Sequence, residues 1–139
     1  MKKTELLTQI KPHLLITDLG FLVYWMLTAV GVLSPVPADA LHSSDFLTAW
    51  NWSFLPLDVL ASLLGLLAVF LTSRFDVTPL VVVSLTLTHV AGLNAIAFWA
   101  IRGDFSLEWW LPNLYLMLFP LWFLPRLICL QTRPITPVL

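Results

Sequence analysis

The sequence has few charged residues and a single cysteine. Charged residues make up 11% of its 139 positions and the net charge is −1, whereas an average soluble domain carries about 25% charged residues. The seven basic residues are scattered, which excludes the basic stripe that follows nucleic-acid phosphates, so no nucleic-acid partner is expected. Because Cys129 is the only cysteine, an internal disulfide, a CxxC redox pair and a thiolate metal site are excluded.

The common enzyme signatures are also missing. The sequence contains no GxSxG, HExxH, GxGxxG or P-loop motif, and each of these positions the chemistry of a large enzyme class. His89 has no second histidine or carboxylate at the spacing of a metal site. We therefore expect no metal and no cofactor, and the sequence favours a protein without enzymatic activity.

Apolar residues fill most of the chain. They make up 59% of the sequence, and the mean hydropathy is +0.90. Four stretches reach about twenty residues, the length that an α-helix needs to cross roughly 30 Å of hydrocarbon. They cover residues 13–33, 52–72, 79–101 and 108–130. The predicted fold is all-α: an integral membrane four-helix antiparallel bundle in which residues 1–139 form one domain.

Prolines and polar residues suggest where the helices begin. Pro12 suits the first position of the first helix, and Thr78 followed by Pro79 suits an N-cap with proline behind it. Pro120 and Pro125 fall inside the fourth helix, where proline predicts a kink. Residues 45–50, within the long first connection, suit a short helix at the membrane surface.

The distribution of lysine and arginine predicts the orientation. Cytoplasmic loops of membrane proteins carry an excess of these residues, and here one side receives six of them and the other side only Arg102. We expect both termini in the cytoplasm, the long loop outside, and a bacterial plasma membrane as the location. The six residues are Lys2, Lys3, Lys11, Arg74, Arg126 and Arg133.

Polar residues inside the apolar stretches are the candidate site. At a rise of about 1.5 Å per residue, Asp58, Asn94 and Asn113 fall within about one helical turn of each other in depth. We expect them to form a polar pocket near the outer leaflet, with Arg102 and Asp104 at its mouth. Four tryptophans at this depth would form its walls: Trp52, Trp99, Trp109 and Trp110.

Other readings of these polar residues remain open. Asp58 could instead be a structural acid that pairs with Arg102 or Asn94. Asp18, in the cytoplasmic half, could be hydrated and pair with Lys11, and His89 could be a hydrogen-bonded interior histidine or a proton carrier.

Small residues predict where two helices pack. Stripes of small residues let membrane helices approach closely. The second and third spans should therefore meet along two such stripes, which are Ala61, Ser62, Gly65 and Ala68 on one side and Thr88, Gly92 and Ala95 on the other.

Several strings give the chain a family resemblance. They are TDLGF at 17–21 with YW at 24–25, AWNWSFLPLD at 49–58, GLNAIAFW at 92–99, and DF at 104–105 with WWLPNL at 109–114. The chain resembles the YvaD-like family of small bacterial membrane proteins. The resemblance implies four helices in a bacterial membrane and no activity, because the family is of unknown function. The emopamil-binding-protein-like bundles, which line a ligand pocket with acids and tryptophans, match only in architecture and residue types.

Three functions are consistent with the sequence. The first is a pocket for a small amphipathic, cationic or lipid-like ligand, with the bilayer as the surrounding partner. The second is a membrane enzyme that acts on a lipid or isoprenoid, which requires Asp58 and His89 to reach one cavity. The third is a transport or accessory subunit, which requires a homo-oligomer or another partner.

Overall fold

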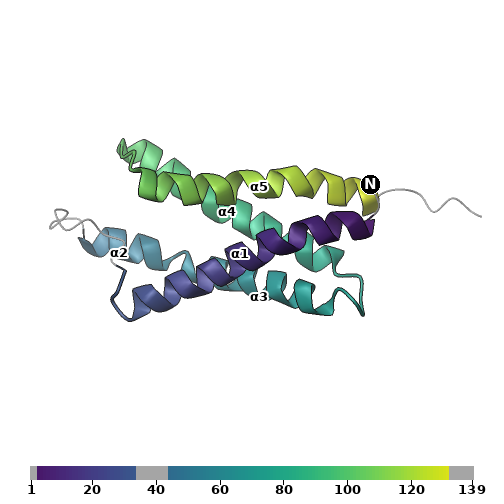
Figure 1. Ribbon diagram of the computed structural model, residues 1–139. Coiled ribbons are helices and arrows are strands. Elements are labelled where there is room, and N and C mark those ends of the chain that lie inside the picture. The colour runs from purple at the N-terminus through teal and green to yellow at the C-terminus, as the bar shows by residue number, and fades with distance from the viewer. Residues whose placement is uncertain (1–2, 34–43, 132–139) are drawn as a thin grey trace, which may run out of the picture.

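The described part of the chain is helical. The computed structural model describes residues 3–33 and 44–131, and these form α1 (Lys3–Ala29), α2 (Ser44–Trp52), α3 (Leu55–Leu71), α4 (Thr78–Arg102) and α5 (Leu107–Gln131) (Figure 1). Short turns join α2 to α3, α3 to α4 and α4 to α5. The orientation signals at Lys2 and Arg133, and most of the long first loop, lie outside the described residues.

Four segments are long and apolar enough to cross a membrane. Three of them are α1, α4 and α5, and the fourth is the stretch Asp45–Leu71, which contains nearly all of α2 and the whole of α3. Within residues 3–33 and 44–131 no strand occurs, so the predicted all-α class and the four apolar helices are confirmed. The short helix expected at 45–50 is α2, and a turn at Ser53 and Phe54 separates it from α3. Large apolar side chains such as Phe70 and Ile101 remain 75% and 88% exposed, as expected for surfaces that face lipid.

Two predicted helix starts were wrong. Pro12 lies inside α1, which begins at Lys3 because Leu6 and Ile10 are fully buried against the other helices. Thr78 is already helical, and its backbone N–H donates to Asp76 Oδ1 at 3.1 Å. The oxygen that caps the start of α4 therefore belongs to Asp76 and not, as predicted, to Thr78.

The helices pack around one apolar core and one smaller cluster. The core lies where α1, α4 and α5 meet near the start of α1, and the turn between α3 and α4 closes it. The small-residue stripe of α3 is buried as predicted, and Gly65 faces Asp18 of α1 and Ser84 of α4. Gly92 does not face α3, because a side chain there would meet the backbone of α5 at 2.7 Å from the Asn113 carbonyl oxygen.

The bundle is open on one side. α4 and α5 form an antiparallel pair, and α3 packs against both α1 and α4. α1 and α5 meet near the N-terminus and diverge toward the end that carries α2 (Figure 1). This divergence leaves room between α1 and α5 in the half of the bundle that contains Asp58.

Candidate functional site

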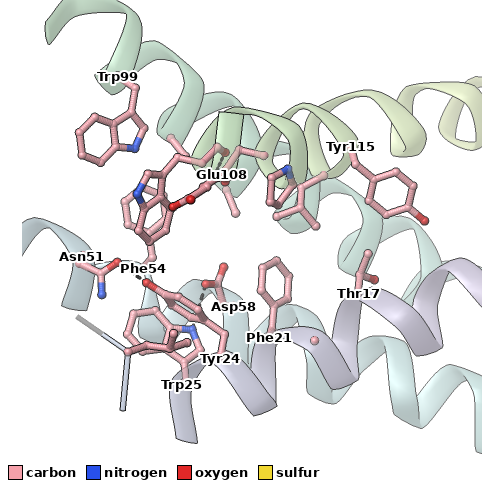
Figure 2. Close-up of a pocket in the computed structure, with 18 of the residues that line it drawn as sticks. Thr17, Phe21, Tyr24, Trp25, Asn51, Phe54, Asp58, Trp99, Glu108 and Tyr115 are labelled. Atoms are coloured by element: carbon pink, nitrogen blue, oxygen red, sulfur yellow. Dashed lines mark hydrogen bonds between the residues drawn. The ribbon is translucent and has the colours of Figure 1, made fainter. Parts of the chain in front are cut away.

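A cavity of about 510 Å³ lies in the open half of the bundle. Residues from all five helices or their adjoining turns line it, and most of them are apolar or aromatic (Figure 2). Pockets for small molecules typically have volumes of about 300 to 1,000 Å³ and are mostly apolar, with a few placed polar groups. The cavity has this size and character.

Asp58 is the central polar group of the cavity. α3 begins at Leu55 with Pro56 behind it, so Asp58 falls in the first turn, where the helix dipole favours a carboxylate. Its side chain is 5% exposed. Oδ2 accepts a hydrogen bond of 3.0 Å from the indole nitrogen of Trp25, whereas Oδ1 has no hydrogen-bond partner within the described residues. One oxygen is thus held in place, and the other is a buried acceptor without a hydrogen bond.

A second polar pair ties α2 to α1 beside this carboxylate. The Tyr24 hydroxyl donates to Asn51 Oδ1 at 2.8 Å, and the Asn51 side chain is buried (Figure 2). The amide nitrogen of Asn51 has no hydrogen-bond partner within residues 3–33 and 44–131. The pair positions an unused N–H donor in the same cavity as Asp58.

Aromatic rings form the wall at the α2 end. The Trp50 ring contacts Phe54 edge-on at 4.9 Å and stacks on Phe98 at 3.8 Å. Trp99 contacts Trp50 at 5.8 Å and stacks with Trp109 of α5 at 6.2 Å. Aromatic faces carry partial negative charge and attract cations, so these rings add to the attraction that a carboxylate exerts on a cation.

α5 supplies the opposite wall. Glu108 and Trp109 lie in its first turn, and Asn113 lies one turn further on. The Asn113 amide donates to the Trp109 carbonyl oxygen at 2.7 Å. Glu108 is exposed and brings a second carboxylate to the rim of the cavity (Figure 2).

At the other end, an α1–α5 contact bounds the opening. His13 Nδ1 and the Tyr115 hydroxyl are 2.8 Å apart, and the His13 ring stacks on Phe119 at 5.4 Å. Tyr115 and Thr17 both line the cavity. The two diverging helices are therefore joined just beyond the cavity.

The structure brings together only some of the residues predicted for the site. Asp58, Asn113, Trp99 and Trp109 line the cavity. Asn94 does not, because it lies on the exposed face of α4. The expected grouping of Asp58, Asn94 and Asn113 was therefore wrong for Asn94.

Four of the predicted residues lie outside the lining: Arg102 and Asp104, expected at the mouth, and Trp52 and Trp110, expected in the walls. The Arg102 guanidinium sits over the rings of Phe98 and Trp99, at 5.7 and 5.9 Å. The Asp104 carbonyl oxygen accepts a bond of 2.9 Å from the Trp110 indole. Trp52 packs on Trp25 at 5.4 Å from the exposed side. Asp58 pairs with neither Arg102 nor Asn94, because the Trp25 indole is its partner.

Asp18 and His89 also lie away from the cavity. Asp18 is fully buried against α3 and α4, so the expected exposure at the interface and the pairing with Lys11 were wrong. His89 Nδ1 donates to the Met117 carbonyl oxygen at 2.7 Å, between α4 and α5. Because His89 does not line the cavity that contains Asp58, an enzyme that moves protons between these two groups has no geometric basis.

Sequence reasoning missed several lining residues. Trp25, Tyr24, Asn51 and Glu108 were not selected, although the first three fall within the strings that carry the family resemblance. The spacing of residues along α1 and α3 could have identified Trp25. Trp25 lies seven residues after Asp18 in α1, and Gly65 lies seven residues after Asp58 in α3. Antiparallel helices in that register place Trp25 beside Asp58 and Asp18 beside Gly65, as observed.

Comparisons with known proteins identify relatives of unknown function. A family model described as "Family of unknown function (DUF5360)" matches residues 10–134. A Bacillus subtilis (strain 168) protein named "Uncharacterized protein YvaD" is 41% identical over 120 residues, which cover 85% of this chain and 90% of that protein. No solved structure matches. Within the described residues, no three His, Cys, Asp or Glu side chains gather as a metal site.

Proposed function

The chain belongs to the DUF5360 family of unknown function, and from this premise we propose that it is a membrane protein that binds a small cationic amphiphile or lipid-like molecule. The observation that carries the proposal is the arrangement around Asp58. A carboxylate with one fixed oxygen and one unused oxygen lies in an aromatic cavity of about 510 Å³.

The charge of the ligand follows from the groups that surround it. Asp58 and Glu108 are the charged side chains of the cavity lining, and both are acidic. The rings of Trp25, Trp50 and Trp99 offer faces that favour a positive charge. A carboxylate in a site of low dielectric attracts an opposite charge more strongly than it would in water. An ammonium headgroup therefore suits this cavity better than a phosphate or carboxylate headgroup.

The shape of the opening favours a ligand that comes from the bilayer. The cavity is lined from α1 by Ile16 and Gly20 and from α5 by Pro112 and Leu116, which are apolar residues on the two diverging helices. A molecule with an alkyl tail can lie between these helices with its tail toward lipid and its headgroup toward Asp58. Free diffusion in the membrane then supplies the ligand.

The location and orientation belong to the same proposal. The bacterial plasma membrane is the proposed site, with both termini in the cytoplasm and the α2 end outside. Lys3 and the turn that carries Arg74 and Asp76 lie at one end, where Lys3 bonds Asp76, in agreement with the excess of basic residues on that side. Alkaline phosphatase and green fluorescent protein fused to the C-terminus test it, and an active phosphatase fusion would contradict the cytoplasmic assignment.

Binding can be tested with three surfactants of one chain length and different charge. The purified protein in lipid nanodiscs is titrated with dodecyltrimethylammonium, dodecyl sulfate and dodecyl maltoside, and tryptophan fluorescence reports occupancy. The cationic probe should bind at least about tenfold more tightly than the other two, a difference of roughly 1.4 kcal/mol. Equal binding of the three probes would overturn the proposal.

A pair of matched variants locates the site. Asp58→Asn should lower the affinity for the cationic probe by about tenfold or more, because the carboxyl group that attracts the cation is lost. Asp104→Asn removes the same charge outside the cavity lining and should leave binding unchanged. If both variants lose affinity equally, the attraction comes from the general charge of the surface. If Asp58→Asn fails to accumulate in the membrane while Asp104→Asn does, the acid is structural.

A further inference from the structure

A second buried acid lies outside the cavity and is used by none of the contacts described so far. Asp18 of α1 has no exposed surface, and neither of its oxygens has a hydrogen-bond partner within the described residues. Its neighbour Thr17 gives its hydroxyl proton to the His13 carbonyl oxygen at 2.9 Å. Asp18 does not line the cavity that contains Asp58.

The fold makes space for this carboxyl group. A side chain at Gly65 of α3 would overlap Asp18 Oδ2, so the carboxyl occupies the space beside the glycine. The Ser84 hydroxyl oxygen of α4 lies 2.8 Å from the position that a β-carbon on Gly65 would take. This hydroxyl donates its proton to the Ala61 carbonyl oxygen at 3.0 Å. Gly65 of α3 and the Ser84 hydroxyl of α4 thus lie at the Asp18 carboxyl group, and within residues 3–33 and 44–131 no charged group pairs with it.

The charge of such a group must be neutralised. An isolated carboxylate in an apolar interior is far less stable than its protonated form, and buried acids of this kind take up a proton. In membrane proteins, acids at this depth mark proton and ion pathways. We propose that Asp18 is a proton-binding site, and that its proton exchanges with the cavity along the face of α3 that carries Ser62 and Asp58.

The route follows from the positions of the unpaired polar atoms. Ser62 is fully buried, and its hydroxyl also has no hydrogen-bond partner within the described residues. It lies one turn after Asp58 and one turn before Gly65, so all three share one face of the helix. Buried polar groups of this kind normally hold ordered water. In the exchange, the O–H bond of Asp18 breaks, Ser62 accepts that proton through water and releases its own hydroxyl proton, and an O–H bond forms on Asp58; a proton returning by the same route restores the O–H bond of Asp18.

Infrared spectroscopy tests the proton-binding site in the absence of any ligand. The result therefore does not depend on the proposed ligand-binding function. The full chain in lipid should show the carbonyl stretch of a protonated carboxylic acid at neutral pH. Asp18→Asn should remove this band, and Asp58→Asn should leave it in place. A spectrum without the band, or a band that survives in Asp18→Asn, would overturn the proposal. Should Asp18→Asn fail to fold, isotope-labelled aspartate in the unmodified chain gives the same answer through the carboxyl carbon shifts.

The route is tested by exchange in heavy water. In the unmodified protein the band shifts as the acidic proton is replaced by deuterium, and the rate of that shift is measured. Ser62→Ala should slow the shift roughly tenfold, the factor that corresponds to the loss of one hydrogen bond. Ser53→Ala, in the exposed turn before α3, is the matched control and should not change the rate. Equal rates in Ser62→Ala and the unmodified protein would exclude the route.

Discussion

Trp25 and Asp58 join α1 to α3 through one buried hydrogen bond, in which the indole N–H donates to the carboxylate at 3.0 Å. The carboxylate is therefore oriented by an aromatic residue and not by a basic one. Because the indole is uncharged, the bond orients the Asp58 carboxyl group without forming an ion pair. Two turns away along the same pair of helices, Asp18 lies against Gly65 and has no hydrogen-bond partner within the described residues. One interface thus holds two acids in contrasting surroundings.

Replacement of Trp25 by phenylalanine should reveal the value of this bond. Trp25→Phe keeps an aromatic ring but leaves Asp58 without its donor, and an unsatisfied buried acceptor costs about 1–3 kcal/mol. The thermal unfolding midpoint in detergent should fall accordingly. Trp52→Phe is the control, because Trp52 is 38% exposed and surface changes usually stay within about 0.5 kcal/mol. Equal midpoints for the two variants would mean that the indole bond does not stabilise the fold.

Substitution of Gly65 should show that the glycine and Asp18 share one space. Gly65→Ala places a methyl group on the Asp18 carboxyl, and overpacking of this kind costs about 1–3 kcal/mol. Gly20→Ala meets nothing within 4 Å and should be neutral or slightly stabilising, because alanine favours a helix over glycine.

A double-mutant cycle in detergent completes this test. Asp18→Ala removes the carboxyl that the new methyl group meets, so Gly65→Ala should cost less in that background. The coupling free energy should be about 0.5–3 kcal/mol. Additive effects of the two substitutions would contradict the close contact.

The hydrogen bond from Tyr24 to Asn51 should hold α2 against the bundle. Tyr24→Phe removes the hydroxyl that donates to Asn51 at 2.8 Å, a bond worth about 0.5–1.5 kcal/mol. Amide hydrogen exchange in α2 should become a few-fold faster, while exchange in α4 stays the same. Tyr115→Phe, which alters the contact with His13 of α1, is the matched control. Unchanged exchange in α2 after Tyr24→Phe would show that aromatic stacking alone holds this helix.

The ion pair between Lys3 and Asp76 should give a small pH dependence at acid pH. The hydrogen bond from Lys3, together with those from Thr78, lowers the pKa of Asp76 from 3.8 to about 2. A carboxyl whose pKa is lower in the folded state stabilises the fold above its unfolded pKa and loses that contribution as pH falls through the folded pKa. The stability difference between the unmodified protein and Lys3→Ala should therefore hold at neutral pH and shrink between pH 3.8 and about 2.

The size of this effect should be modest, because both side chains are exposed, at 38% and 58%. Exposed pairs contribute about 0–1 kcal/mol. Asp76→Ala should cost more than Lys3→Ala, because it also removes the oxygen that caps α4. Denaturant unfolding in detergent at several pH values measures both. A difference that grows as the pH falls would have the wrong sign and would contradict the ion pair.

Much of the fold could be predicted because length and apolarity follow directly from residue order. The four apolar segments, the short helix α2 and the burial of the α3 stripe around Gly65 all agree with the structure. The family was also evident from strings that keep their order along the chain. Position along a helix is a matter of counting, and Asp58 and Asn113, which counting placed together, both line the cavity.

The tertiary structure alone decided which way each helix is turned and what its polar groups contact. Asn94 faces outward, Gly92 faces α5, and Asp58 meets Trp25. In a soluble protein a polar stripe would mark the outer face of a helix. Here apolar residues occur on the exposed as well as the buried faces of the long helices, so the pattern of apolar residues does not mark which face is turned inward. Residue order therefore fixed the position of each group along its helix, and only helix packing fixed its direction.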